Sequence, residues 1–150
     1  MPIIWTCKPF EELQPRELYA ILRLRNEVFV VEQNCVFQDA DNKDFYAYHV
    51  MGWLDGNLVA YTRLLPPGIS YVHASIGRVV NSGTVRGSGA GRELMLQSIS
   101  ILYSLWGKIP IQIGAQLYLE QFYKSLGFQQ ISPVYLEDGI DHIEMLLQPA

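Results

Sequence analysis

The residues IGRVV at positions 76–80, followed by RGSGAGR at positions 86–92, form the most informative stretch of the sequence. The first run predicts a strand, and the second is rich in glycine and leads into a long helical pattern. Glycine lets backbone N–H groups converge and lets a ligand approach closely. The start of the following helix adds unpaired N–H donors and the positive end of the helix dipole. This stretch therefore predicts a site for a diphosphate group.

The spacing of the glycines narrows the kind of ligand. The run lacks the Gly-Lys-Ser/Thr of a P-loop, and it lacks the glycine spacing and the early position of a dinucleotide-binding fingerprint. Arg-x-x-Gly-x-Gly after a strand in mid-chain is typical of acetyl-CoA pyrophosphate sites. A flexible surface loop is the alternative, but the strand before and the helix after favour the cofactor. The expected cofactor-binding residues are Arg86, Gly87, Ser88, Gly89, Ala90, Gly91 and Arg92.

Strands and helices are predicted on both sides of this stretch. Pro15 suits the first turn of a helix, and Asp55-Gly56 is a strong hairpin signal. The apolar patterns predict strands over 3–7, 48–54, 58–65, 75–80, 110–115, 128–136 and 142–147, and helices over 15–30, from Gly91 to about 106, and over 119–126. This order predicts one α/β domain over residues 1–150, a sandwich with a mixed, largely antiparallel sheet.

The composition argues against several classes of protein. Hydrophobic residues make up 49% and charged residues 17% of the 150 positions, which argues against disorder. A net charge of -4 without a Lys/Arg run argues against nucleic acid as a partner. We see no secretory leader and no apolar stretch of membrane-spanning length, so we expect a cytoplasmic protein. The two cysteines and three histidines lack ligand spacing, so we expect no metal.

Four stretches of the chain together resemble the GNAT acetyltransferases, and within them the ElaA family. RGSGAG (86–91) resembles the GNAT pyrophosphate loop, and FYKSLGF (122–128) resembles the late Phe-Tyr-x-x-x-Gly-Phe element of that superfamily. RLRNEVFVVEQ (23–33) and DGIDHI (138–143) resemble stretches specific to ElaA proteins. The resemblance spans nearly the whole chain. It implies an acetyl-CoA-dependent N-acetyltransferase that passes acetyl directly from the CoA thioester to an amine.

The resemblance also implies how the fold holds acetyl-CoA. A GNAT fold has a mixed, mostly antiparallel central sheet, helices on both faces, and two central strands that splay apart. The pantetheine arm lies between these two strands, which here correspond to 76–80 and 111–115. Backbone groups of Val79 and Val80 would then pair with the pantetheine and polarise the thioester carbonyl.

The proton transfers have candidate residues as well. Acetyl transfer needs a neutral amine, a stabilised oxyanion and a proton for the departing thiolate. The resemblance places Tyr123 at the tyrosine that faces the CoA sulfur, so we expect it to be the general acid, with core packing as the alternative. Candidate bases are Glu32, His49, His142 and Glu144. His142 and Glu32 rank first among them, and water is the alternative.

The acceptor side is defined less sharply by the sequence. By resemblance to the ElaA family, Arg25 and Gln33 are expected to contact the acceptor; for Arg25, an ion pair on the helix surface is the alternative. The loop acids Asp39, Asp41 and Asp44 could attract a cationic amine or simply face solvent. A protein N-terminus, a lysine side chain, a small amine and an antibiotic all remain open as acceptors. Exposed aromatic residues could also serve a homodimer.

Two other functions use the same motifs. One is a non-catalytic acyl-CoA sensor of the same fold, which would bind acetyl-CoA without acetylating any acceptor. The other is a different nucleotide binder, which the absent P-loop and dinucleotide spacings disfavour. Turnover separates the first alternative from the enzyme, and ligand competition separates the second.

Overall fold

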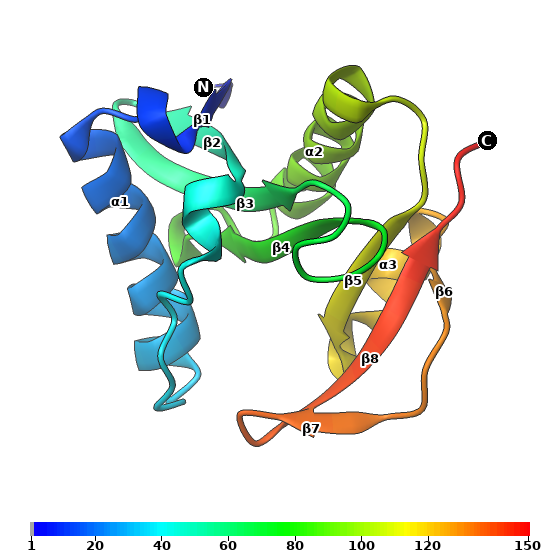
Figure 1. The fold of residues 1–150 in the computed structure, drawn as a ribbon. Coiled ribbons are helices and arrows are strands. Elements are labelled where there is room, and N and C mark those ends of the chain that lie inside the picture. The colour runs from blue at the N-terminus through cyan, green and yellow to red at the C-terminus, as the bar shows by residue number, and fades with distance from the viewer. Residues whose placement is uncertain (1) are drawn as a thin grey trace.

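The computed structural model describes residues 2–150 and contains one mixed sheet with helices on both faces (Figure 1). The strands are β1 (Ile4–Pro9), β2 (Tyr48–Leu54), β3 (Asn57–Leu65), β4 (Ala74–Asn81), β5 (Ile111–Gln116), β6 (Gln129–Gln130), β7 (Tyr135–Glu137) and β8 (Ile140–Leu147). Their order in the sheet is β1-β2-β3-β4-β5-β8-β6, and β7 pairs with the start of β8. Only β4 and β5 run parallel among the paired strands of residues 2–150. The predicted α/β architecture is confirmed.

The three α-helices are α1 (Pro15–Arg25), α2 (Ala90–Trp106) and α3 (Glu120–Ser125). Successive side chains of a strand point to opposite faces, and β3 shows why both faces are covered. Ala60 and Leu64 pack in the core that contains α2 and α3, whereas Tyr61 packs in the core that contains α1. Among residues 2–150, none of the helices is both long and apolar enough to span a membrane.

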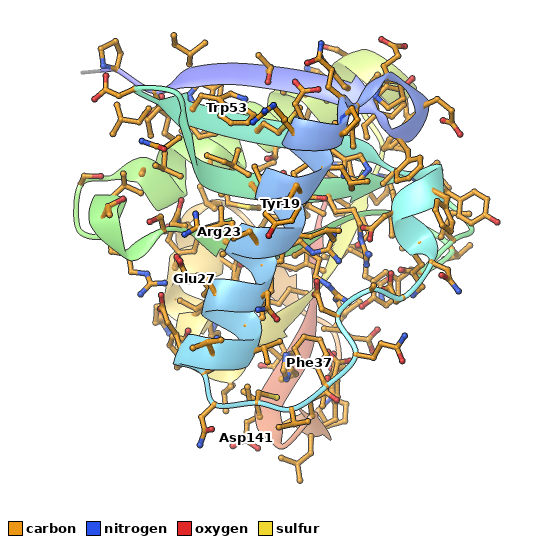
Figure 2. All side chains as sticks on the ribbon, turned by 90° about the vertical axis from the view of Figure 1, so that its left-hand side faces the viewer. Tyr19, Arg23, Glu27, Phe37, Trp53 and Asp141 are labelled. Carbon is orange, nitrogen blue, oxygen red and sulfur yellow. The ribbon has the colours of Figure 1, made fainter. Side chains whose placement is uncertain are left out.

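Helix α1 starts where the sequence predicts. Pro15 takes the first helical position, and the side chains of Gln14 and Glu17 form a capping box around it. Buried residues face the sheet, while Tyr19 and Arg23 lie on the outward face of the helix (Figure 2). The helix was expected to run to Val30, but its α-helical part ends earlier.

A π-helical segment, Asn26–Glu32, continues α1 with seven residues of wider turn. Each π turn contains an extra residue, so the side chains that follow are rotated relative to an unbroken α-helix. Glu32 and Gln33, at the end of this segment, line the main cavity of the molecule. Helical periodicity alone predicts the helix but not this widening, which is why the predicted boundary was wrong.

Strands β4 and β5 separate soon after they begin. Only Ala74 and Ser75 pair with β5, through Ile111 and Gln112, and the strands then diverge (Figure 1). Among residues 2–150, the β5-facing edge of residues 76–81 therefore has no strand partner. The splayed pair implied by the family resemblance is present.

A β-bulge interrupts β4 where the two strands diverge. Tyr61 pairs with Val80 and Arg63 pairs with Gly77, so β4 contains one residue more than β3 between these pairs. Arg78 lies in the bulge with φ +50°, which is the left-handed region that non-glycine residues rarely adopt. A bulge re-aims the backbone and side chains of its strand and is common beside active sites.

The predicted strand over 128–136 is broken in two. Gln129–Gln130 and Tyr135–Glu137 both pair with β8, but the segment between them leaves the sheet. Pro133 lies in this gap and has no N–H to donate to a ladder. Ser132 Oγ instead accepts a hydrogen bond of 2.8 Å from the backbone N–H of Glu144 in β8.

Candidate active site

An open cavity of about 870 Å³ lies between the diverging strands. Its walls come from β4 residues 75–81, from β5, from the π-helical segment and from the face of α3 that carries Tyr123. A smaller hollow of about 420 Å³ is lined by Gly89 and by five residues of α2: Arg92, Glu93, Leu96, Gln97 and Ser100. The larger cavity is the candidate active site, because it contains the unpaired strand edge together with titratable side chains.

The glycine-rich loop reaches one end of this cavity through Arg86 and Gly91, which belong to the cavity wall. Gly87 and Gly89 adopt φ +82° and +86°, the left-handed region that glycine enters without steric cost. The first hydrogen bond inside α2 runs from Glu93 N to Gly89 O at 3.1 Å. The amides of residues 90–92 therefore have no partner in the helix and remain available. Ser88 is different, because its amide donates to Val85 O at 3.3 Å.

Asn81 and Gly91 make a close contact beside this loop. A Cβ placed on Gly91 would lie 3.1 Å from Asn81 Nδ2, so a larger residue would push the asparagine away. Asn81 Oδ1 is buried, belongs to the cavity wall and has no hydrogen-bond partner within residues 2–150. Buried polar atoms nearly always have a partner, so this oxygen fits a donor supplied by a ligand. The amide N–H groups of a pantetheine arm are donors of that kind.

The two arginines of the loop make different contacts. The Arg86 guanidinium lies 2.7 Å from a Glu32 carboxylate oxygen, and it also donates to Asn81 O at 3.1 Å. Arg92 Nη1 donates to Ser125 Oγ at 3.1 Å and so links α2 to α3. Arg86 is thus in the cavity wall, whereas Arg92 lines the smaller hollow along α2.

Tyr123 lines the same cavity from α3. Its side chain is 4% exposed and packs edge-on against Phe122 and Phe128, with ring centroids 5.1 and 5.9 Å away. Tyr123 therefore packs in the core and also lines the candidate site. Burial, with a smaller effect of Tyr118, raises the pKa of Tyr123 above its ordinary value. The phenol consequently stays protonated at neutral pH.

His142 lies in β8 on the other side of the cavity. Its Nδ1 is 2.7 Å from the carbonyl oxygen of Ile140, which can only accept, so Nδ1 carries a hydrogen. In the neutral ring, Nε2 therefore keeps its lone pair. A carboxylate oxygen of Glu137 lies 3.7 Å from Nε2, and the ring of Tyr135 stacks on the imidazole at 5.9 Å. This geometry leaves Nε2, the nitrogen that faces Glu137, as the one that can accept a proton.

The other candidate bases have different environments. Glu32 lines the cavity, but its carboxylate already holds Arg86. His49 is fully buried outside the cavity lining, with Nδ1 2.6 Å from the Tyr61 hydroxyl. Glu144 accepts a hydrogen bond from Gln112 at 2.9 Å and also lies outside the lining. The structure therefore brings His142 and Glu32 together with Tyr123, and it leaves out His49 and Glu144.

Arg25 corrects the sequence-based interpretation. Its guanidinium is 0% exposed and bonds to Asp39 and Asp44 at 2.8 Å each, so it lies neither on the helix surface nor in the cavity lining. Gln33 does line the cavity, and its side-chain amide exchanges two 3.2 Å hydrogen bonds with Gln116 of β5. In this geometry Arg25 has a structural role, and Gln33 connects the two walls of the cleft.

The acidic loop is likewise not free to attract a cation. Asp39, Asp41 and Asp44 bond to three arginines, Arg25, Arg63 and Arg78, at 2.7–3.3 Å. The interpretation of these acids as a solvated or acceptor-attracting loop was wrong. Their partners come from α1, β3 and β4, which are distant in sequence, so no local pattern reveals the pairing.

Residues of the cavity wall that the sequence did not suggest include Lys43, Tyr71, Gly114 and Glu137. A Cβ on Gly114 would lie 3.1 Å from the Tyr71 hydroxyl, so the two meet closely at the wall. The glycine inside the strand over 111–115 was the only sequence signal for this contact, because glycine in a strand often marks a close approach. Among residues 2–150 no group of three His, Cys, Asp or Glu side chains is arranged to hold a metal.

Comparisons with known proteins identify the family of this chain. A family described as an acetyltransferase (GNAT) domain matches residues 25–149. Protein ElaA of Escherichia coli K12 is 42% identical over 145 residues, which make up 95% of each chain. An acyl-CoA N-acyltransferase from Pseudomonas aeruginosa, known from its crystal structure, is 44% identical, with a TM-score of 0.92 over 97% of this chain and 99% of the other. The crystal structure of Escherichia coli ElaA gives 40% identity and the same TM-score and coverage.

The chain therefore belongs to the GNAT acetyltransferase family and has the fold of the acyl-CoA N-acyltransferases. It is an acyltransferase. The expected resemblance to ElaA proteins is confirmed over nearly the full length of the chain.

Proposed function

We propose that the protein binds acetyl-CoA between β4 and β5 and transfers the acetyl group to a primary amine. The observation that carries this proposal is the early separation of the two strands, which leaves the edge of residues 76–81 unpaired inside a cavity. The same cavity wall includes Gly91, whose free amide lies at the start of α2. An extended pantetheine arm fits the strand edge, and a pyrophosphate fits the amides.

Each wall supplies a different part of the binding site. The amides of residues 87 and 89–92, with Arg86, would hold the pyrophosphate. The backbone of Val79 and Val80 would pair with the pantetheine arm, next to the bulge at Arg78. Asn81 Oδ1 would accept a hydrogen bond from it.

His142 and Tyr123 have separate roles in the proposed acetyl transfer. The amine nitrogen forms a bond to the thioester carbon, and the carbon–sulfur bond breaks. His142 Nε2 accepts the proton that the amine loses, and Glu137 stabilises the imidazolium. Tyr123 donates a hydrogen bond to the developing thiolate. An alkyl thiol has a pKa of about 8.5, below that of this buried phenol. The tyrosine therefore keeps its proton and stabilises the thiolate through a hydrogen bond. The proton that the amine gives to His142 is passed on through water to the thiolate, so CoA leaves as the free thiol.

A turnover assay with a conservative variant tests the proposal. The protein is mixed with acetyl-CoA and a panel of peptides, polyamines and small amines, and free CoA is measured. Tyr123→Phe should lower kcat about 100-fold, the usual size of a general acid–base contribution. Its Kd for CoA, measured by calorimetry, should change less than about twofold, because the hydroxyl acts on the sulfur and not on the pyrophosphate. Tyr19→Phe on the outward face of α1 is the matched control (Figure 2).

Two results would contradict parts of the proposal. An unchanged rate in Tyr123→Phe would remove that residue from the mechanism. Acetyl-CoA that binds and raises the melting temperature, while no amine on the panel is ever acetylated, would favour the non-catalytic sensor instead.

A further inference from the structure

The ionic cluster at the rim of the cavity is balanced without Lys43. Three arginines and three aspartates pair with one another there, as described above. Lys43 belongs to the same loop, is half-buried and lines the cavity. Its Nζ donates to Ser70 Oγ at 2.9 Å, and no carboxylate of residues 2–150 lies within 4.0 Å of it. The cavity wall therefore carries one ammonium group that the protein does not neutralise.

Another part of the cavity wall carries surplus charge of the opposite sign. Glu137 and Asp138, in the turn between β7 and β8, both line the cavity. Within residues 2–150, neither carboxylate forms an ion pair with a lysine or an arginine, and a carboxylate oxygen of Glu137 lies 3.7 Å from Nε2 of His142. The backbone oxygen of Asp138 accepts a hydrogen bond from Cys35 Sγ at 3.2 Å, which holds this turn against the loop after the π-helical segment. Figure 2 shows that loop, with Phe37, at the same end of the molecule as Asp141 of β8.

A short chain of contacts joins these two parts of the cavity wall. Tyr71 follows Ser70, and its hydroxyl lies 3.1 Å from the position that a Cβ would take on Gly114. The hydroxyl of Tyr135 lies 3.2 Å from the same position, and the Tyr135 ring stacks on His142. Burial, with the charges of Tyr135, Glu144 and Glu137, raises the pKa of Tyr71 to about 12, so its hydroxyl is a neutral donor. Lys43 and His142 thus line one continuous cavity, and the contacts between them run through Ser70, Tyr71 and Tyr135.

We infer that the acceptor is a small amine that also carries a carboxylate. Lys43 and Ser70 bind the carboxylate, and the wall with His142, Glu137 and Asp138 receives the amino group. The inference rests on the proposed acetyl transfer, since it names the acceptor class of that same site. Surplus charges of opposite sign in one cavity match a molecule that has both charges, and an amine without a carboxylate leaves Lys43 unpaired. Discrimination between amines with and without a carboxylate then comes from Lys43 and Ser70 rather than from acetyl-CoA.

Amines that differ only by a carboxylate test the inference. Three pairs serve: lysine and cadaverine, histidine and histamine, tyrosine and tyramine. The ratio of kcat/KM between the two members of each pair is measured with acetyl-CoA. The wild-type protein should prefer the carboxylated member of at least one pair about tenfold, the usual effect of one charge-assisted contact. Lys43→Gln should bring that ratio close to one, whereas Lys108→Gln, at an exposed site outside the cavity, should keep it.

A charge reversal and a binding measurement make the outcome decisive. Lys43→Glu should prefer cadaverine to lysine, because the second ammonium of cadaverine then has a partner. Ser70→Ala should lower the wild-type ratio less than Lys43→Gln does. A ratio near one for every pair, or a ratio that Lys43→Gln leaves unchanged, would overturn the inference while acetylation of plain amines still upheld the proposed function. Circular dichroism verifies that each variant is folded.

Calorimetry with CoA present separates the remaining cases. If carboxylated amines bind and Lys43→Gln weakens that binding about tenfold, as the loss of one charge-assisted contact should, the acceptor class stands even where no acetylation follows, and the proposed catalysis falls. If no amine of either kind is bound or acetylated, both the acceptor class and the proposed function are overturned.

Discussion

Two loops border the cleft, and their polar groups are arranged in opposite ways. In the loop over residues 38–44 every aspartate is held by an arginine, and these contacts are buried or partly buried. Over residues 86–92 most backbone amides have no partner, and Arg86 makes an ion pair that is about half exposed. The first loop, the acidic loop, therefore has a conformation fixed by ion pairs. The second loop, called the receptor loop below, presents free hydrogen-bond donors to a ligand. Charged residues alone do not distinguish a binding loop; the pairing of those residues does.

The two loops also differ in what fixes their conformation. The acidic loop is fixed by ion pairs to α1, β3 and β4, and removing one partner leaves a buried charge without compensation. The receptor loop is fixed by the backbone, because Gly87 and Gly89 adopt left-handed φ angles with no atom within 4 Å of the place that a Cβ would take. Mutations should therefore damage the first loop through charge and the second through backbone strain.

The largest effect is expected from Asp44→Asn in the acidic loop. Asp44 Oδ1 bonds to Arg25 Nη1 at 2.8 Å and to Arg63 Nη1 at 3.2 Å, so the amide leaves two buried guanidinium groups short of charge. We expect the free energy of unfolding to fall by about 3 kcal/mol, the range for a broken buried ion pair. Urea unfolding measures it. The exposed Asp141→Asn is the control, and a loss below about 1 kcal/mol in Asp44→Asn would contradict the structural role of the cluster (Figure 2).

The same cluster should make the protein sensitive to acid. Burial alone would raise the pKa of Asp41, but the hydrogen bonds and charge of Arg63, with smaller effects of Lys43 and Arg78, lower it to about 2. An unfolded aspartate has a pKa of about 3.9, so the folded value is the lower one. The stability that this group contributes is complete above about pH 4 and is lost as the pH falls toward about 2. Urea unfolding from about pH 5 down to about pH 2 should show a steeper loss for wild type than for Asp41→Asn, and parallel curves would refute this.

The sequence predicts the receptor loop better than the acidic loop for a physical reason. Glycine spacing, a preceding strand and a following helix are local features, and all of them lie within residues 76–92. The partners of the acidic loop lie as much as 39 positions away, as with Arg78 and Asp39, so no local pattern contains them. The widening of the first helix over Asn26–Glu32 is a small backbone change that helical periodicity does not record.

The site residues follow the same rule. Tyr123 and His142 lie in local motifs that resemble a known family, and both are placed in the cavity wall. Arg25 lies in such a motif too, but its role depends on distant aspartates, and it is buried away from the cavity. Lys43 and Tyr71 belong to no motif. Only the folded chain brings them to the cleft.

A smaller effect is expected from a backbone change in the receptor loop. Gly89 has φ +86° and no atom within 4 Å of a Cβ position, so Gly89→Ala should cost only the strain of a left-handed residue, about 1–2 kcal/mol. Gly83→Ala in the turn just before this loop is the matched control, because Gly83 lacks a left-handed φ and its Cβ would meet only Arg86 Nη1 at 3.8 Å. Thermal and urea unfolding compare the two. Equal stabilities would show that the loop is not held by its glycine conformations.

The ion pair between Glu32 and Arg86 lies where the receptor loop meets the π-helical segment, and its two halves should have opposite effects on CoA binding. The carboxylate lies 2.7 Å from the guanidinium, so an anion that binds Arg86 must compete with Glu32. Arg86→Gln should weaken CoA binding about tenfold through the loss of a charge-assisted contact. Glu32→Gln should strengthen it about twofold, because the competitor is gone and the pair is only half-buried. Calorimetry at low and high salt measures both Kd values, and the difference should shrink as salt screens the charges.

The same pair of variants decides whether Glu32 is a base or a partner of Arg86. If Glu32 is the base, Glu32→Gln should lower kcat and leave the Kd for CoA unchanged. A partner of Arg86 would change the Kd and leave the pH dependence of kcat intact, since His142 then accepts the proton. Because one Glu32 oxygen is already bonded to Arg86 and the His142 Nε2 lone pair is free, the structure favours the second outcome. Weaker CoA binding in Glu32→Gln would contradict it and would place Glu32 among the groups that hold the loop.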